Sequence, residues 1–184
     1  MPSFPYQRIV VIGSTGSGKT MLAESLATCL GIPHIELDAL HWEQNWTHAS
    51  DDEFRLRVAA ASSAPAWVAD GNYGISRDIL WGRAEAVIWL DYSLWTVFWR
   101  LWNRTWRRWW TRELLWGINR EPLLVHFKLW SDESLIRWLF KTYWRRKRQY
   151  PALFASPEYS RLIVVHLRSP QQAEIWLNGI CPAS

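Results

Sequence analysis

The stretch Ile9-Val10-Val11-Ile12-Gly13-Ser14-Thr15-Gly16-Ser17-Gly18-Lys19-Thr20 decides the fold. Its first four residues are all β-branched and predict a buried parallel strand, and the residues after Thr20 follow a helical pattern. The glycines between them permit backbone angles and close approaches that a Cβ would forbid. Strand, glycine-rich turn and helix in this order are typical of a phosphate-binding loop, or P-loop. We therefore predict that residues 13–20 bind phosphate.

The P-loop motif gives specific roles to two residues. The backbone amides of the turn and the positive end of the following helix would hold phosphate oxygens. Lys19 would reach the β- and γ-phosphates as a catalytic cation, and the hydroxyl of Thr20 would be a ligand of Mg²⁺. ATP and Mg²⁺ are therefore the predicted cofactors. The alternative, a flexible turn that happens to precede a lysine, does not account for the flanking strand and helix.

Length and composition limit the class of protein. With 184 residues the chain suits one domain and a small insertion, and its net charge of +4 suits phosphate-bearing ligands without demanding nucleic acid. The two cysteines, Cys29 and Cys181, have neither metal-ligand nor redox-motif spacing, which predicts a reduced, cytoplasmic protein. We expect no signal peptide. We also expect no transmembrane helix, because Asp91 interrupts the most apolar window, Ala86 to Trp102.

Apolar runs that alternate with helical patterns predict the remainder of the core. Four further strands are expected at 33–37, 66–69, 86–90 and 161–166. Helices are expected from a capping box at Ser50–Glu53 through about residue 62, and at 75–81 and 170–177. This alternation predicts a three-layer α/β/α fold around a parallel sheet with right-handed crossovers. Ligands in such sheets collect at the carboxyl ends of the strands. Four residues belong to that edge: Gly13, Asp38, Asp70 and Asp91.

Acidic residues at strand ends are the candidates for holding the metal through water. Asp70 closes a hydrophobic strand next to the strand of the P-loop, so we predict that it assists Mg²⁺. Asp91 is the rival and ranks lower because its strand leads directly into an insertion. A purely structural aspartate that caps the turn before Gly71 is the remaining alternative for Asp70.

The polar and aromatic segment 38–46 is expected to be a loop on the acceptor side of the site. Phosphoryl transfer needs little covalent chemistry from the protein, so an oriented acid near the acceptor suffices. Asp38 is therefore the predicted catalytic residue for the acceptor. His41 could accept a hydrogen bond or a proton there, or it could have no catalytic role.

Residues 92–155 are predicted to form an all-helical insertion that holds many of the chain's 16 tryptophans. At about 100° per residue, the arginines of its first helix, from Arg100 to Arg108, lie on one face and the tryptophans, from Trp95 to Trp110, on another. The arginine face could be a lid over the triphosphate or a solvated surface. The tryptophan face is interpreted as core or partner interface, including a homodimer, rather than as a base-stacking platform.

The P-loop, Leu37-Asp38-Ala39-Leu40-His41-Trp42, Asp70-Gly71-Asn72-Tyr73 and the arginine-bearing insertion together resemble one known family. Over nearly its whole length the chain resembles the adenylate-kinase-related P-loop proteins called topology modulation (FlaR-like) proteins. The resemblance implies a P-loop NTPase fold with strand order 2-3-1-4-5, an acceptor region after strand two and an arginine lid after strand four. It also implies that Arg100 and Arg104 are catalytic lid arginines and that Arg168 lies beside the adenine of ATP.

The resemblance leaves the acceptor open. Adenylate kinases have a further glycine directly after the P-loop lysine, and Phe-Pro-Arg after the Asp-Gly of strand three. Here Thr20 follows the lysine, and Asn72-Tyr73 follows Asp70-Gly71. The residues that would grip AMP are therefore not evident.

These features predict one domain, 1–184, with a core at 1–91 and 156–184 and a lid at 92–155. The predicted function is a cytoplasmic small-molecule kinase that transfers the γ-phosphoryl group of ATP, with Mg²⁺, to a nucleotide or another small acceptor. The alternative is an ATP-dependent nucleic-acid-binding or regulatory protein that uses the basic, tryptophan-rich insertion.

Overall fold

The computed structural model describes residues 4–44, 47–111, 114–115, 119–120 and 135–181. Its central sheet consists of β1 (Arg8–Gly13), β2 (His34–Glu36), β3 (Trp67–Asp70), β4 (Ala86–Leu90) and β7 (Ile163–Leu167). All pairs of neighbouring strands are parallel, and their spatial order is β2-β3-β1-β4-β7. Counted along this sheet, the order is 2-3-1-4-5, so the predicted fold is confirmed.

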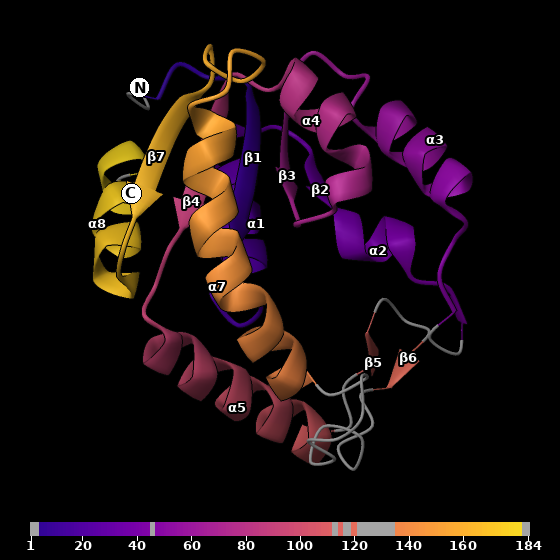
Figure 1. Ribbon diagram of the computed structural model, residues 1–184, viewed down its shortest axis with the longest axis vertical. Coiled ribbons are helices and arrows are strands. Elements are labelled where there is room, and N and C mark those ends of the chain that lie inside the picture. The colour runs from indigo at the N-terminus through magenta and orange to yellow at the C-terminus, as the bar shows by residue number, and fades with distance from the viewer. Residues whose placement is uncertain (1–3, 45–46, 112–113, 116–118, 121–134, 182–184) are drawn as a thin grey trace.

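Helices cover both faces of the sheet (Figure 1). They are α1 (Lys19–Leu30), α2 (Leu37–His41), α3 (Asp51–Ala61), α4 (Arg77–Arg83), α5 (Leu94–Thr111), α7 (Leu135–Phe154) and α8 (Pro170–Ile180), with a short 3-10 turn, η2 (Gly74–Ser76). No helix in the described part of the chain is both long and apolar enough to cross a membrane.

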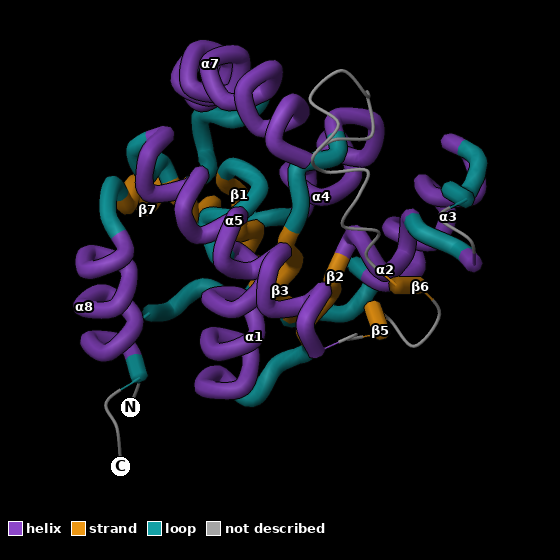
Figure 2. The backbone as a smooth tube through the Cα atoms, turned by 90° about the horizontal axis from the view of Figure 1, so that it is seen from below, coloured by secondary structure: helices purple, strands orange, loops and turns teal. Residues whose placement is uncertain are grey.

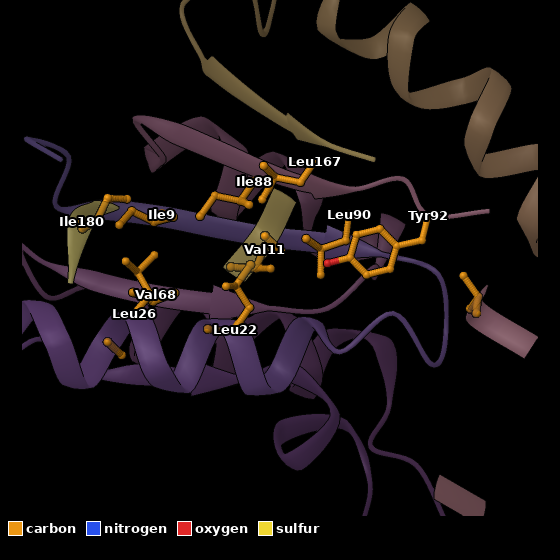
Figure 3. Close-up of a cluster of buried hydrophobic side chains, with 14 of the residues drawn as sticks. Ile9, Val11, Leu22, Leu26, Val68, Ile88, Leu90, Tyr92, Leu167 and Ile180 are labelled. Atoms are coloured by element: carbon orange, nitrogen blue, oxygen red, sulfur yellow. The ribbon is translucent and has the colours of Figure 1, made fainter. Parts of the chain in front are cut away.

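Alternating side chains of β1 contribute to two hydrophobic cores, as the period of two in a strand requires. Ile9 and Val11 pack with residues of α1, α5 and α8 on one face. Their neighbours Val10 and Ile12 pack with residues of α3 and α4 on the other. Figure 3 shows the first core, in which side chains of α1 point toward Val11 and the adjacent strand. The three central strands, β1, β3 and β4, are buried on both faces and consist mostly of apolar residues.

The insertion between β4 and β7 contains two long helices and a small hairpin. Figure 2 shows α5 crossing the end of the sheet, whereas α7 lies over the face opposite α1. The strands β5 (Leu114–Leu115) and β6 (Asn119–Arg120) pair antiparallel, so the prediction of an all-helical insertion was wrong. Residues 112–113, 116–118 and 121–134 of the predicted insertion lie outside the described residues.

The segment after β2 also differs from the prediction. Residues expected to start a loop form the short helix α2, which is held by tertiary packing: Leu37 is buried, and the ring of His41 packs against Phe54 of α3. Packing of this kind, rather than intrinsic propensity, stabilises so short a helix, and for that reason no periodic signal exists in the sequence. Asn45 and Trp46 of the expected loop lie outside the described residues.

Cys29 and Cys181 form a disulfide, which contradicts the prediction of reduced thiols. The first lies near the end of α1 and the second directly after α8, and these helices pack side by side against the sheet. Their 152-residue separation in the sequence gives no sign of this proximity. Disulfides persist mainly in oxidising compartments, so this pairing does not support the predicted cytoplasmic location.

One interpretation placed the tryptophan face of α5 in the core, but several of these tryptophans lie outside it. Trp95, Trp99 and Trp106 are exposed. The helix is anchored instead through Val97 and Leu101, which are fully buried. The homodimer predicted through the tryptophan face stays a prediction.

Candidate nucleotide and acceptor site

The P-loop leaves the sheet at the predicted edge. Gly13 ends β1 level with Leu90 of β4, and the turn is closed by a hydrogen bond from the amide of Ser17 to the carbonyl of Ser14 (3.0 Å). Gly16 and Gly18 have φ angles of 86° and 87°, in the left-handed region that favours glycine. Left-handed residues of this kind curl a turn into a concavity lined by N–H groups, the usual anion site before a helix. Lys19 is the first residue of that helix, α1.

The two predicted metal residues meet beside this loop. The hydroxyl of Thr20 donates a hydrogen bond of 2.7 Å to Oδ2 of Asp70, a buried carboxylate at the end of β3. Hydroxyl and carboxylate oxygens are the hard ligands that Mg²⁺ prefers, and this ion usually keeps several waters and binds phosphate oxygens as well. Within the described ranges no three His, Cys, Asp or Glu side chains could hold a metal ion by themselves. The Thr20 hydroxyl and the Asp70 carboxylate fit an ion that arrives with a nucleotide.

His34 shares the carboxylate of Asp70. Its Nε2 lies 2.9 Å from Oδ1, and this hydrogen bond is the main reason why the pKa of His34 is raised above its usual 6.5. A protonated His34 compensates the buried negative charge while Thr20 satisfies the other oxygen. No local signal in the sequence points to this role of His34, because its partner lies in a different strand.

Asp91, the rival for the metal, is engaged elsewhere. His166 Nε2 lies 3.0 Å from one of its carboxylate oxygens and Lys147 Nζ lies 3.5 Å from the other. The structure thus places Asp70, and not Asp91, in hydrogen-bond contact with Thr20.

Helix α5 packs directly on the P-loop. A Cβ added to Gly16 would lie 2.9 Å from both Cβ of Leu101 and the carbonyl oxygen of Val97. A Cβ added to Gly18 would lie 2.9 Å from Nη2 of Arg100, so this predicted lid arginine lies against the loop. Arg104 is half-buried about one turn further along α5. The predicted phosphate side of the site therefore includes Arg100.

Arg168, predicted to lie beside the adenine, follows the last strand of the sheet. It comes directly after Leu167, which is level with Leu90 in β4 and hence with the start of the P-loop. Its side chain is exposed, and its backbone N–H donates to Oε1 of Gln172 at 2.8 Å. Arg168 therefore lies at the ligand edge of the sheet, two strands from β1.

Asp38 lies on the other side of the P-loop strand, in α2. Its Oδ1 accepts a hydrogen bond of 2.7 Å from the hydroxyl of Tyr73. Burial raises the pKa of Tyr73 far above its usual value, so this phenol stays a hydrogen-bond donor. The ring of His41 contacts those of Tyr73 and His48, and burial lowers the pKa of His41. The two residues predicted for the acceptor side thus both adjoin Tyr73.

Asn72 and Tyr150 connect the lid to the P-loop strand, and neither residue was predicted to do so. The Asn72 side chain donates to the carbonyl of Gly13 (2.6 Å) and accepts a hydrogen bond from the Tyr150 hydroxyl (3.0 Å). Asn72 belongs to a turn that the sequence singled out. Tyr150, 78 residues further on, has no local signal that pairs it with this turn.

A small pocket, with room for about one water molecule, lies between β1, α4, α7 and the turn after β3. Its polar lining consists of Asn72, Tyr73, Arg77 and Tyr150, and its apolar lining includes Leu37 and Trp81. Because Tyr73 binds Asp38, the pocket adjoins the predicted acceptor residue.

Two arginines lie near this pocket without an ion-pair partner in the described part of the chain. Arg77 lies over the ring of Trp81, 5.3 Å from its centroid. Arg146 of α7 has its Nη1 buried without a hydrogen-bond partner, and burial is the main reason why its pKa is lowered. The electrostatic neighbours of Arg146 include Tyr150, Asp38 and Tyr73. A buried, unsatisfied guanidinium nitrogen is costly and suits an anionic ligand.

A protein-family model matches part of the chain. Residues 9–91 match the model described as "ATPase family associated with various cellular activities (AAA)". This stretch runs from β1 to the residue after β4, so it contains the P-loop and Asp70 but not α5. Comparison with curated proteins gave no match.

Solved structures match over nearly the whole chain at low sequence identity. A gluconokinase from Sinorhizobium meliloti 1021 is 20% identical with a TM-score of 0.52, covering 95% of this chain and 93% of that one. A shikimate kinase from Bacteroides thetaiotaomicron is 17% identical with a TM-score of 0.56 (94% and 95% covered). The shikimate kinase from Acinetobacter baumannii in complex with shikimate is also 17% identical with a TM-score of 0.56 (95% and 92% covered). Membership of the topology modulation family stays a prediction, whereas strand order and these likenesses show that the chain has the fold of P-loop small-molecule kinases.

Proposed function

We propose that the protein is a Mg²⁺-dependent kinase that transfers the γ-phosphoryl group of ATP to a small acceptor. The observation that carries this proposal is the hydrogen bond between Thr20 and the buried carboxylate of Asp70 beside the P-loop. A hydroxyl and an acid in this relation are what phosphoryl transfer requires for its metal ion. The fold shared with gluconokinase and shikimate kinases is a second support.

On the donor side, the loop amides of residues 13–20 would bind the phosphates, and Lys19 would reach the β- and γ-phosphates. Mg²⁺, held by Thr20 and through water by Asp70, would bridge phosphate oxygens and neutralise the charge that develops in transfer. Arg100 and Arg104 would add positive charge from α5, and Arg168 would lie beside the adenine. In this assignment residues 92–155 are the lid, and 1–91 with 156–184 are the core of one domain.

On the acceptor side, Asp38 would accept a hydrogen bond from the attacking hydroxyl and orient it, with Tyr73 holding the carboxylate in place. Arg77 and Arg146 would bind a negatively charged group of the acceptor. We therefore propose that the acceptor carries both a hydroxyl and an anionic group, a carboxylate or a phosphate ester. Asn72 and Tyr150 would position the pocket between the lid helix and the loop.

The experiment is a screen for acceptor-stimulated release of ADP from Mg-ATP. The panel contains hydroxy acids, sugar phosphates, nucleoside monophosphates and the uncharged counterparts of each. We expect turnover only with anionic, hydroxyl-bearing compounds, and a decrease of about 10²-fold or more for Lys19→Ala, which removes a donor to the transferring phosphate. Lys147→Ala, which removes a lysine paired with Asp91, is the matched control and should retain turnover.

Asp38→Asn separates the two halves of the site. It should raise the KM of the acceptor or lower kcat, with ATP binding almost unchanged. A folded Lys19→Ala protein with undiminished turnover would rule out the kinase, whereas turnover with neutral acceptors alone would rule out only the anionic acceptor.

A further inference from the structure

The two insertion helices share an aromatic surface on the outside of the molecule. We define the aromatic patch as Trp95, Phe98 and Trp99 of α5 with Phe140 and Trp144 of α7. Ring contacts join the helices: Trp95 to Trp99 (5.5 Å between centroids), Trp99 to Phe98 (5.7 Å) and Phe98 to Phe140 (6.4 Å). Trp144 follows Phe140 by four residues on the same helix face. The patch is therefore continuous across both helices.

Most of the patch is open to solvent. Trp95 is 68% exposed, Trp99 45%, Phe140 48% and Trp144 56%. Exposed apolar side chains are ordinary when they are scattered, but a contiguous group of large rings marks an interaction surface. The same helices bury other residues, such as Leu101 and Leu139, against the core. The aromatic patch is thus additional to the face that holds the helices in place.

Basic residues of α7 border the patch. Neither α5 nor α7 contains an aspartate or glutamate. Lys141, Arg145 and Arg148 of α7 are exposed. Lys141 directly follows Phe140, and Nε of Arg148 donates to the carbonyl of Trp144 at 3.3 Å. Aromatic and positive side chains therefore share one surface.

This charge pattern discriminates among the possible occupants. A second copy of the chain would bring the exposed basic residues of two α7 helices together, and like charges in an interface oppose association. A single-stranded nucleic acid needs ring faces that are open for stacking. In the patch, Trp95 and Trp99 meet edge to face at 89°, and Phe98 and Trp99 at 73°, so the rings already pack on one another. An anionic lipid surface attracts the basic residues and does not require ring faces that are open for stacking.

We propose that the aromatic patch docks the protein on the surface of a membrane that contains anionic lipids. Tryptophan is the side chain that membrane–water interfaces favour, because its ring is apolar and its indole N–H stays hydrated. An amphipathic helix with tryptophans and nearby basic residues lies in the interface plane, and each lysine or arginine adds attraction to anionic headgroups. Val97 and Leu101, which contact the P-loop, are buried and do not contact the membrane. The docked protein therefore keeps its proposed kinase site free of lipid.

The test is flotation of the full chain with vesicles of phosphatidylcholine, alone or mixed with phosphatidylglycerol. We expect binding to the mixed vesicles that weakens as salt is added, because screening reduces the attraction of the basic residues. Trp95→Ser/Trp99→Ser should weaken binding about tenfold or more, since two large exposed rings lose their burial in the interface. Lys141→Gln and Arg148→Gln should each weaken it about fivefold.

The matched control is Leu56→Ser/Ile175→Ser, which removes two apolar side chains that are 67% and 73% exposed outside the patch. It should bind vesicles like the unchanged protein. If the double tryptophan variant does not fold, the two charge variants decide the test.

Four results would overturn the proposal. The first is that the protein does not bind the mixed vesicles at low salt, and the second is that the tryptophan and the charge variants both bind them like the unchanged protein. The third is that the control variant loses as much binding as the patch variants. The fourth is that the patch variants abolish binding to a single-stranded oligonucleotide or to a second copy of the chain, and not binding to vesicles.

Discussion

Replacing Arg146 by methionine should make the protein more stable and a poorer kinase at the same time. Arg146 reaches from α7 toward Asp38 and Tyr73, and its Nη1 is buried without a hydrogen-bond partner in the part of the chain that the structure describes. Such a group lowers stability in the absence of a ligand that satisfies it. Methionine keeps the length and much of the apolar stem while it removes the charge.

The magnitude follows from the unsatisfied donor. A buried donor without a partner costs about 1–3 kcal/mol. Repulsion from Arg145 adds to this cost, and attraction to Asp38 offsets part of it. We therefore expect Arg146→Met to raise the free energy of unfolding by about 1–2 kcal/mol, or the Tm by about 2–4 °C for each kcal/mol. The lost hydrogen bond to an anionic acceptor is worth about 1.5–3 kcal/mol, which lowers kcat/KM for the acceptor roughly 10- to 100-fold.

Urea unfolding without ligand and ADP release with the acceptor measure the two effects. The neighbouring change Arg145→Met is the matched control, because that side chain is exposed, and it should alter stability by no more than about 0.5 kcal/mol and leave the acceptor's KM unchanged. An Arg146→Met protein that is less stable than its parent, with normal acceptor kinetics, would show that Arg146 is a structural residue and that our reasoning about its buried nitrogen is wrong.

Three further changes test other parts of the structure. Gly16→Ala places a Cβ against Leu101 at a φ of 86°, so it should lower stability by about 1–3 kcal/mol in urea unfolding, whereas Gly179→Ala, with open space around it, should not. His34→Gln should lower the Tm most on the acid side of pH 6.5. Because the pKa of His34 is raised in the folded protein, its pairing with Asp70 stabilises the fold fully below the pKa of the unfolded chain and is lost as pH rises through the folded pKa. A Tm difference that does not depend on pH would contradict this. Cys29→Ser should cost about 3–5 kcal/mol, and reduction of the unchanged protein by dithiothreitol should reproduce the loss; if the reductant has no effect on the Tm, the disulfide does not form in solution.

The elements that the sequence predicted well are those with local signals. The P-loop could be recognised because strand, turn and helix adjoin one another in the chain, and Asp70 because it ends a clear apolar run. The strand order came with the family resemblance and could not be read from the strands themselves. Parallel strands that are buried on both faces look alike in sequence, since each is a short apolar run without alternation.

The residues that the sequence missed depend on contacts between distant segments. Tyr150 and Arg146 belong to a helix that is basic and aromatic throughout. No local pattern in the sequence indicates that these two side chains face Asn72 and Asp38. The pairing of His34 with Asp70 joins neighbouring strands in the same way. Tertiary placement decides these roles, so a single sequence carries little information about them.

The sequence left open whether the tryptophan side of α5 is core or a partner interface. Arginines and tryptophans divide the helix clearly, but the core uses Val97 and Leu101, which lie on the arginine side. Close packing against the P-loop glycines needs small side chains, and a tryptophan would not fit there.

Helix α5 is a stiff rod about 27 Å long that touches the P-loop with one side and exposes tryptophans on another. Two ligands, one at the P-loop and one at the tryptophans, can therefore both influence its position. Any shift of the rod that accompanies nucleotide binding would also change the position of Trp95 and Trp99. Thermodynamic linkage then requires reciprocity: the factor by which ATP changes the affinity for an anionic lipid surface equals the factor by which that surface changes the affinity for ATP. A rod that does not move on nucleotide binding gives a factor of one in both directions.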